Sequence, residues 1–380
     1  MFTWMEIALA AALLLFVYPF AIYPAILLLL VRPKPRAAEP SRDVESLPSA
    51  VLIICALNEQ KMIRQKIENS LALDYPAGKL RIVVVSDGSS DATAAIAREY
   101  VPQGIELIER EQRRGKVANL NEVIAQRTED VIVLSDANVI YDRHALLFLM
   151  ENLRDSAVGC VSGKVALIDT TKSLQASEQS YYSLEWTLQE KASAIHSMAG
   201  ADGAMYAFRR KLFRPCPPDT LIEDFVLPLA IVRQGYRAVF EPRATAWESG
   251  VTGLHEEFRR KTRIAAGAAQ ALLRGNGWPL GAPLSFWFVF VSHKLLRWLS
   301  PWTGLAMLLL AALSLPSLFG AIVCAGFGAV LLAALLRWAG VPHRLLDAPF
   351  YFLFEQAALL LGLCKGIAGR QSVLWAKVDR

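Results

Sequence analysis

The stretch 81-RIVVVSDGSSDAT-93 decides the fold class of this chain. Its first half is a short, valine-rich apolar run, which is typical of a strand buried on both faces. Its second half is polar and contains a glycine that permits a tight turn, and Ser90 or Asp91 can cap a following helix. A buried strand that turns directly into a helix is the building unit of a parallel α/β sheet.

Two other runs have the same texture, 50-AVLIICAL-57 and 131-VIVLSDAN-138. Helix candidates lie between the runs, at 59–72 and 91–100. Because strands alternate with helices, we predict an α/β domain with a Rossmann-like, mostly parallel sheet over residues 49–250.

Polar residues follow all three predicted strands. They are Asn58 and Glu59 after the first strand, Asp87 after the second, and Asp136 and Asn138 after the third. Ligands of such sheets bind beyond the carboxyl ends of the strands, so we expect these side chains to surround one binding site. An ordinary strand-to-helix turn is the alternative interpretation for Asp87.

A cationic segment, 113-RRGKVANLNEVI-124, precedes another predicted helix. A helix N-terminus flanked by cations such as Lys116 is suited to bind a diphosphate, with a solvated charged loop as the alternative. Asp136 and Asn138 offer oxygen ligands to a hard divalent ion such as Mg²⁺ or Mn²⁺, which would neutralise a diphosphate.

Two adjacent acids, Glu223 and Asp224, stand inside the apolar run 220-TLIEDFVLPLAIVRQGY-236. A buried carboxylate is costly unless it is paired, liganded or used in chemistry. Desolvation also raises the pKa of a carboxylate and makes it a better proton acceptor near neutral pH. The alternative is that the two acids only cap the helix that follows at 225–235.

The ends of the chain are strongly apolar. Hydrophobic residues make up 54% of the 380 residues and the mean hydropathy is +0.33, which points to a membrane protein. Ile7 to Val31 has 25 residues without a charge, enough for a membrane-spanning helix. A cleavable signal peptide, the alternative, would need a basic segment before a shorter apolar core. Arg32, Lys34 and Arg36 follow, so the positive-inside rule places the next residues in the cytoplasm.

The C-terminal region predicts further spans. Residues 299–336 carry no charge and contain a proline near the middle, which indicates a hairpin of two helices, and a third apolar run at 348–364 is interrupted only by Glu355. Three spans would leave a basic tail outside, against the positive-inside rule. The basic residues concerned are Lys365, Arg370, Lys377 and Arg380. Either one apolar stretch lies in the membrane interface, or 284–298 also crosses.

A basic amphipathic helix is predicted between the two regions, at 255–274. We expect it to lie on the membrane surface with Arg259, Arg260 and Lys261 directed toward lipid phosphates. The expected divisions are therefore a transmembrane helix (1–31), a linker (32–48), the α/β domain (49–250), an interfacial segment (251–298), two or three transmembrane helices (299–368) and a tail (369–380).

Composition excludes several other classes of protein. The net charge is +5, without the dense Lys/Arg stripes and interleaved aromatics of a nucleic-acid-binding protein, so no nucleic-acid partner is expected. The five cysteines are scattered, which argues against a disulfide framework or a zinc site and favours a reducing compartment. A dinucleotide-dependent oxidoreductase would need GxGxxG after the first strand, and 55-CALNEQ-60 has no glycine. A transporter is disfavoured because the spans carry few polar groups.

The order of the motifs resembles that of glycosyltransferase family 2. The motifs are NE after the first strand, SDGSSD after the second, RxGKxxN, the DxD-like SDAN, and ED followed by GY, over residues 49–267. The segment 200-GADGAMYAFRR-210 is similar to the acceptor-side segment of that family. The resemblance implies the GT-A fold and transfer of a sugar from a nucleotide donor, with inversion at the anomeric carbon.

The resemblance also implies a role for each matching residue. Asp224 is the implied general base, and Asp202 and Glu223 are implied acceptor contacts. The implied nucleotide-sugar contacts are Asn58, Glu59, Asp87, Lys116, Asp136 and Arg263. Asp136 and Asn138 would hold a divalent metal, Mg²⁺ or Mn²⁺. A UDP-sugar donor, a lipid-linked or polysaccharide acceptor and a place in cell-envelope polysaccharide synthesis at the membrane, with the catalytic domain in the cytoplasm, are implied as well.

Two departures from the family pattern bear on function. Asn138 replaces the second acid of DxD, so Asp136 would hold the metal with help from the donor phosphates. Processive members have QxxRW, whereas 260-RKTRI-264 retains Arg263 but has arginine for glutamine and isoleucine for tryptophan. Because the tryptophan that stacks on the acceptor sugar is missing, the sequence is as consistent with transfer of one or a few sugars as with polymer synthesis. A non-catalytic nucleotide-sugar sensor or partner platform at the membrane remains the alternative function.

Overall fold

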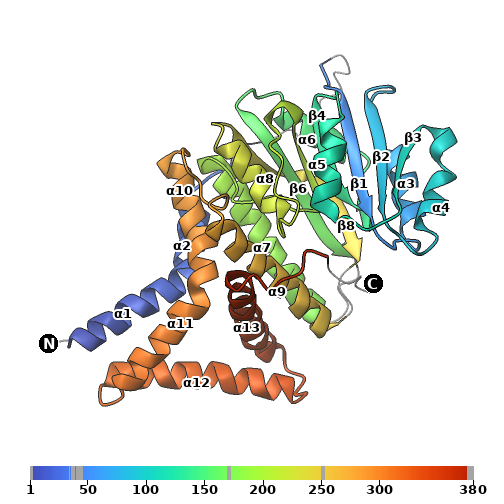
Figure 1. Cartoon of the computed structure of the whole chain (residues 1–380). Helices are drawn as coiled ribbons and strands as arrows, with labels where there is room; N and C mark the ends of the chain where they lie inside the picture. The colour runs from blue at the N-terminus through green and yellow to red at the C-terminus, as the bar shows by residue number, and fades with distance from the viewer. Residues whose placement is uncertain are drawn as a thin grey trace.

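The computed structural model describes residues 3–33, 35, 39, 46–168, 173–249 and 253–374. It consists of an α/β domain and a group of long apolar helices that extends from one side of it (Figure 1). Lys34, Arg36, Lys377 and Arg380, which entered the orientation argument, lie outside the described residues, as do parts of the predicted linker and tail.

The described part of the α/β domain contains one mixed sheet of eight strands in the order β3-β2-β1-β4-β7-β6-β8-β5. The strands are β1 Ala50–Ala56, β2 Leu80–Asp87, β3 Ile105–Arg110, β4 Val131–Asp136, β5 Val139–Tyr141, β6 Val158–Ile168, β7 Met205–Arg209 and β8 Arg237–Ser249. The four strands from β3 to β4 are parallel, whereas β7 runs antiparallel to both of its neighbours. The predicted strands and their parallel pairing are confirmed.

Helices cover both faces of the sheet. They are α3 Ile63–Leu71, α4 Thr93–Arg98, α5 Lys116–Ala125, α6 Ala145–Asn152, α7 Ser173–Ile195, α8 Glu223–Val232 and α9 Leu254–Leu273. Side chains alternate along a strand, so Val51 and Ile53 face the core beneath α5 and α8, while Leu52 and Ile54 face the core beneath α3 and α6. Burial on both faces explains why β1, β2 and β4 read as continuous apolar runs.

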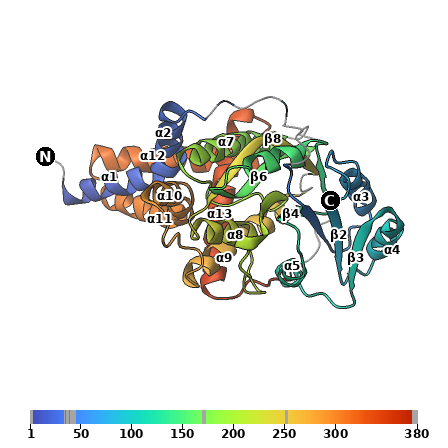
Figure 2. The ribbon, with the colours of Figure 1, turned by 90° about the horizontal axis from the view of Figure 1, so that it is seen from above.

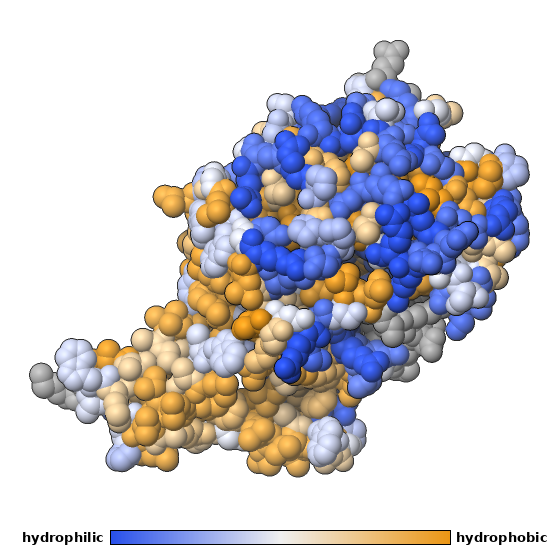
Figure 3. Space-filling model, viewed as in Figure 1, coloured by the Kyte–Doolittle hydropathy of each residue, from blue (hydrophilic) through white to orange (hydrophobic). Residues whose placement is uncertain are grey.

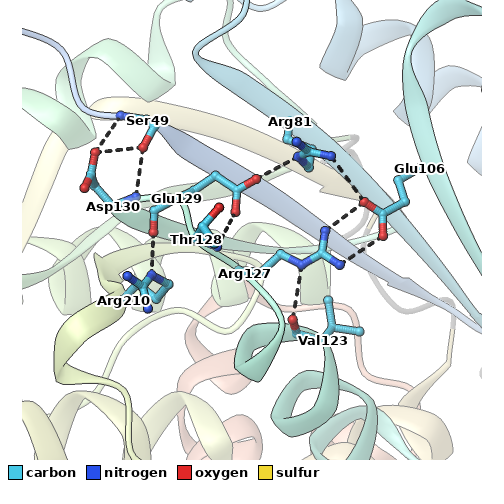
Figure 4. A network of polar contacts seen from close by, with 9 residues as sticks. All are labelled: Ser49, Arg81, Glu106, Val123, Arg127, Thr128, Glu129, Asp130 and Arg210. Atoms are coloured by element: carbon cyan, nitrogen blue, oxygen red, sulfur yellow. Dashed lines mark hydrogen bonds and ion pairs between the residues drawn. The ribbon is translucent and has the colours of Figure 1, made fainter.

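A network of polar contacts joins the amino ends of β1, β2 and β4 (Figure 4). The Asp130 carboxylate accepts hydrogen bonds from the backbone N–H and the hydroxyl of Ser49, at 3.1 and 2.7 Å. Arg127 donates two hydrogen bonds to Glu106, at 2.7 and 3.0 Å. The polar groups at this edge bind one another, whereas those at the carboxyl edge surround a cavity.

The N-terminal apolar segment forms one continuous helix, from α1 (Trp4–Val17) to α2 (Tyr23–Leu30). A π-helical turn at Tyr18–Ile22 joins them. Pro19, which has no N–H to donate, lies in this turn and accounts for the irregularity.

The C-terminal apolar helices are α10 Leu284–Phe290, α11 Leu296–Leu313, α12 Leu318–Trp338 and α13 Asp347–Ile367. A π-helical turn makes α10 and α11 one continuous helix, so 284–298 is not a separate crossing. Four helical segments of the described chain are long and apolar enough to cross a membrane, at 4–30, 284–313, 318–338 and 344–367. The N-terminal helix, the hairpin and the third apolar helix are thus present as predicted.

Helices α1, α11 and α12 pack together around Leu9, Met307 and Ala311. They lie on the side of the molecule opposite β2 and β3, as both ribbon views show (Figures 1 and 2). The surface over these helices is mostly hydrophobic, whereas the visible face of the α/β domain is mostly hydrophilic (Figure 3). An apolar surface of this extent is expected of a bundle surrounded by lipid.

Helix α9 does not direct its basic residues toward lipid in the way that its sequence suggested. Arg260 donates hydrogen bonds to Glu257 and to the Tyr182 hydroxyl, and Lys261 forms ion pairs with Glu257 and with Glu355 of α13. Of the three predicted cations, Arg259 alone is exposed. The reason is that α13 packs along α9 and covers the side that carries Lys261.

Candidate active site

A cavity of about 290 Å³ lies at the carboxyl ends of β1, β2 and β4. Nine of the ten predicted site residues line it, although they come from seven different parts of the chain. The nine are Glu59, Asp87, Lys116, Asp136, Asn138, Asp202, Glu223, Asp224 and Arg263. Parallel strands end at one edge of the sheet, and this explains why strand-end residues so distant in sequence meet.

Asn58, the tenth residue, does not line the cavity but joins two loops next to it. Its side-chain oxygen accepts a hydrogen bond of 2.7 Å from the backbone N–H of Ser90. Its backbone is left-handed, with φ of 54°, a conformation that asparagine tolerates better than most residues. Asn58 therefore holds the loop after β2 against the loop after β1.

Asp87 holds the cationic loop in place. Its two carboxylate oxygens accept hydrogen bonds from the backbone N–H groups of Arg114 and Gly115, at 2.7 and 2.8 Å. The loops approach so closely that a side chain at Gly88 would lie 2.6 Å from the backbone nitrogen of Arg113, and Gly88 also has a φ of +68°. Because a carboxylate oxygen has two lone pairs, Asp87 can still accept a hydrogen bond from a ligand in the cavity.

Lys116, the first residue of α5, lies between two acids. Its ammonium is 2.9 Å from the Asp136 carboxylate and 2.7 Å from that of Glu223. Burial alone would lower the pKa of Lys116, but the two carboxylates raise it well above its usual range. Lys116 is thus a permanent cation at the N-terminus of a helix, where an anionic ligand is favoured.

Glu223 and Asp224 form the first turn of α8, where negative charge also interacts favourably with the helix dipole. The N-cap residue is Ile222, and neither acid is the N-cap. Glu223 instead points to Lys116, and Asp224 faces the cavity. The alternative that the two acids only cap the helix is therefore not supported, because one pairs with Lys116 and the other lines the cavity.

Burial, followed by the negative charge of Glu223, raises the pKa of Asp224 to about 6. A Cβ atom at position 203 would lie only 2.9 Å from an oxygen of this carboxylate. The backbone of Gly203 therefore packs directly against the Asp224 carboxylate, and a larger residue at position 203 would displace it.

A second acidic group, Asp202, also lines the cavity. Burial, and then the charge of Glu248, raise the pKa of Asp202 to about 7. The Asn138 amide donates a hydrogen bond of 3.4 Å to Glu248, which lies near the end of β8. Sequence reasoning missed Glu248 because no motif marks it, and only its place beside β6 in the sheet brings it to the cavity.

Helix α9 closes one side of the cavity. Arg263 donates a hydrogen bond of 2.6 Å to the backbone carbonyl of Leu221, two residues before Glu223. Ile264 lines the cavity beside it, where the family pattern has tryptophan. An aromatic surface comes instead from Tyr182 of α7, which also lines the cavity and stacks on Trp186 with ring centroids 6.2 Å apart. Sequence analysis did not single out these two aromatics.

The oxygen side chains suit a hard cation, provided that a ligand completes the coordination. Asp136 and Asn138 both line the cavity, but no three His, Cys, Asp or Glu residues in the described chain gather closely enough to hold a metal ion by themselves. Mg²⁺-type sites commonly use one or two carboxylates and take the other ligands from substrate phosphates and water. The residues present therefore fit a metal that binds together with a diphosphate.

Comparison with known proteins agrees with this geometry. The model of the family described as Glycosyltransferase like family 2 matches residues 48–267, more than half of the chain. The chain belongs to glycosyltransferase family 2. The resemblance seen in the motif order is thereby confirmed.

Two curated relatives are similar over the same region. A probable glycosyltransferase, YdaM, of Bacillus subtilis is 28% identical over 243 residues, which cover 61% of this chain and 58% of the relative. The poly-beta-1,6-N-acetyl-D-glucosamine synthase of Staphylococcus aureus is 26% identical over 242 residues, covering 62% and 58%. The chain thus spans less than two thirds of the length of these relatives.

One solved structure resembles nearly the whole chain. The mannosyltransferase PcManGT from Pyrobaculum calidifontis, in complex with GDP-Man and Mn²⁺, superposes with a TM-score of 0.73 at 23% identity. The match covers 97% of this chain and 100% of that protein. The likeness therefore extends beyond the α/β domain to the apolar helices, and it confirms the predicted GT-A fold.

Proposed function

We propose that this glycosyltransferase moves a sugar, with inversion, from a nucleotide sugar to a lipid-linked or glycan acceptor at the cytoplasmic face of a cell membrane. The observation that carries the proposal is the placement of Asp224. This half-buried carboxylate, with a pKa raised to about 6, faces the same cavity as Lys116 and Asp136. A base and a diphosphate-binding cation are the two groups that inverting transfer requires.

The reaction can be followed through the residues of the chain. An acceptor hydroxyl oxygen attacks the anomeric carbon while its proton passes to the Asp224 carboxylate. The bond between the anomeric carbon and the diphosphate oxygen breaks, and the nucleoside diphosphate leaves with the electron pair. Lys116 and Arg263 hold the leaving diphosphate by charge. Asp202 and Glu223 position the acceptor hydroxyl, and Glu59 and Asp87 hold the nucleoside.

Asp136 and Asn138 would bind a divalent metal, Mn²⁺ or Mg²⁺, which neutralises charge on the diphosphate when it is bound. The PcManGT complex supports this part of the proposal, because that mannosyltransferase was solved with both GDP-Man and Mn²⁺. Lys116 contacts the Asp136 carboxylate at 2.9 Å and would hold this proposed metal ligand in position.

A UDP-sugar is our first choice of donor, and UDP-N-acetylglucosamine leads because one curated relative is named for that sugar. GDP-mannose is the second choice, since it is the nucleotide sugar in the PcManGT complex. A lipid-linked acceptor is favoured over a long polymer because Ile264 replaces the stacking tryptophan, although Tyr182 offers another aromatic surface.

The test uses the purified full-length chain in detergent with Mn²⁺ and a panel of UDP- and GDP-sugars, with and without membrane lipid extract. Release of nucleoside diphosphate is measured for the wild type and for Asp224→Asn, and donor binding is measured by calorimetry. We expect the substitution to reduce turnover by at least about 10²-fold, as for loss of a general base, and to leave donor affinity within a factor of about two.

Asp74→Asn is the matched control, because Asp74 is a half-exposed aspartate with no part in the cavity. It should leave both turnover and binding unchanged. A wild-type chain that binds a donor but never turns it over, even with lipid extract, would instead favour the nucleotide-sugar sensor.

A further inference from the structure

The C-terminal helices raise a question of topology. After the α/β domain the chain has three apolar helical segments that could each cross a bilayer, the continuous α10–α11, α12 and α13. Three crossings would place the two ends of this region on opposite sides of the membrane. The end of the chain that follows α13 shows that this is not the case.

The segment after α13 lies at the active-site cavity. Val373 lines the cavity. A Cβ atom at position 115 would lie 3.9 Å from the Val373 side chain and 3.6 Å from the Leu374 side chain, so both contact the loop at Gly115. Gly115 is held by Asp87 in the catalytic domain. The C-terminal end of α13 is therefore on the same side as the catalytic domain, and α10–α13 must cross an even number of times.

The charges of the connecting loops indicate which two helices cross. The turn between α11 and α12, residues 314–317, has no charged residue. The opposite end of α12 carries Arg337, and the next loop carries His343 and Arg344, both exposed. The positive-inside rule places the first loop outside and the second loop inside. The pair that crosses is then α11 and α12.

The exposed surfaces of α12 and α13 also indicate that α12 crosses the membrane and α13 does not. Residues 318–336 of α12 are uncharged, about 28 Å long as a helix, and exposed on most sides, so they need lipid around them. Helix α13 is covered along one side by α9. A Cβ at Gly362 or at Gly366 would lie 2.4 Å from a backbone carbonyl oxygen of α9, and Lys261 of α9 pairs with Glu355.

The uncovered stripe of α13 is apolar and consists of Ala357, Leu361, Cys364 and Ile367. A helix with one face on protein and one narrow apolar face outward is suited to lie along a membrane surface rather than across it. Lys365 and Arg370 then remain in the cytoplasm, and the conflict with the positive-inside rule disappears.

We propose that α13 lies in the cytoplasmic interface of the membrane with its apolar stripe in contact with lipid acyl chains, and that the chain crosses the bilayer three times, through α1–α2, α10–α11 and α12. The proposal rests on the membrane location proposed above. It places the N-terminus outside and the C-terminus inside, and it makes α13 the link between the bilayer and α9, which carries Arg263 into the active site.

The test is cysteine accessibility in the full-length chain with its five native cysteines replaced by serine or alanine. Single cysteines are introduced as Leu315→Cys, Val341→Cys and Ser372→Cys, all at exposed positions between or after the helices. A membrane-impermeant maleimide is applied to intact cells and to inside-out vesicles. We expect position 315 to react in intact cells only, and positions 341 and 372 to react in inside-out vesicles only.

The alternatives give different patterns. Reaction of position 372 in intact cells would mean that α13 crosses, and reaction of position 341 there would mean that α12 does not; either result overturns the proposal. Protection of all three in intact cells, with reaction in vesicles, would overturn the crossings themselves. Alkaline phosphatase and green fluorescent protein fused at the C-terminus check the same end without removing any cysteine. Glycosyl transfer is not measured, so these outcomes are separate from a failure of the proposed reaction.

Discussion

At the scale of single residues, the two adjacent acids of the site differ in their contacts with Lys116. Lys116 contacts both Asp136 and Glu223, while Asp224 lies beyond direct reach of its ammonium. The pKa of Asp224 is therefore governed by burial and by Glu223, which raise it, against the weaker opposing charges of Lys116 and Arg263. Two adjacent acids on one helix thus have different surroundings, because Glu223 forms an ion pair with Lys116 and, among the described residues, no cation pairs directly with Asp224.

The first residue-scale prediction concerns pH. Only the carboxylate form of Asp224 can accept a proton, so kcat/KM should fall about tenfold per pH unit below a pKa near 6. Glu223→Gln removes a negative charge that raises this pKa. The acidic limb of the profile, the pH range in which kcat/KM falls, should therefore move to lower pH. The measurement is the pH profile of kcat/KM between pH 4.5 and 8.

Glu99→Gln, at an exposed surface ion pair with Arg64, is the control and should leave the limb in place. Asp202, with a pKa of about 7, is the competing assignment. Disappearance of the limb in Asp202→Asn, or an upward shift in Glu223→Gln, would show that Asp224 is not the group that titrates.

The second residue-scale prediction concerns stability. The folded-state pKa of Asp224, about 6, is above its ordinary value of 3.8, so the ionised form is disfavoured in the folded chain. Stability from this group is fully present below pH 3.8 and is lost as the pH rises through 6. Asp224→Asn carries no charge, so we expect its Tm at pH 8 to exceed that of the wild type by roughly 2–4 °C.

The difference in Tm should shrink toward zero as the pH falls to about 4, where the wild-type carboxyl is protonated as well. Thermal unfolding in detergent at several pH values measures it, with Asp74→Asn as the comparison. A wild type that is the more stable protein at pH 8 would mean that Asp224 has a cationic partner in the folded state.

At the scale of elements, α9 and α13 pack through glycines. The Cβ of any larger residue at Gly366 would lie 2.4 Å from the backbone oxygen of Ala266 and 2.8 Å from the Ala269 side chain. We expect Gly366→Leu to force the two helices apart at a cost of about 1–3 kcal/mol. Because Arg263 is on α9, donor affinity should fall although the substitution is remote from the chemistry.

Gly328→Leu on α12 is the matched control, since a Cβ there has no heavy atom within 4 Å. Calorimetric donor binding and thermal unfolding should both be unchanged in that variant. Equal donor affinity in Gly366→Leu and wild type would show that the packing of α13 does not reach the active site.

At the scale of the whole molecule, the core of the α/β domain continues into the apolar helices. Phe286, Val289 and Phe290 of α10 are buried in the same cluster as Ile222 and Phe225, which flank Glu223 and Asp224 in the sequence. The predicted division of the chain at residue 250 remains a prediction, but side-chain packing is continuous across it.

A chain that ends after residue 274 is therefore expected not to fold. Loss of a single buried phenylalanine side chain costs about 3–5 kcal/mol, and two are lost here, against a total stability of about 5–15 kcal/mol. Size-exclusion chromatography and thermal unfolding of residues 1–274 in detergent check this expectation. A monodisperse fragment with a cooperative transition and full donor affinity would contradict it.

The sequence by itself determined the class of fold, most of the residues that line the cavity, and the presence of long apolar helices near both ends of the chain. Local sequence patterns indicate these features, namely apolar strand-like runs with polar residues at their ends, two acids in an apolar run, and long uncharged segments. Tertiary structure alone decided that Lys116 joins Asp136 to Glu223, that Glu248 and Tyr182 complete the cavity, and that Lys261 pairs with Glu355 instead of facing lipid. The physical reason is that each of these depends on which distant segments pack together, and neither composition nor periodicity records the partner that covers a given helix face.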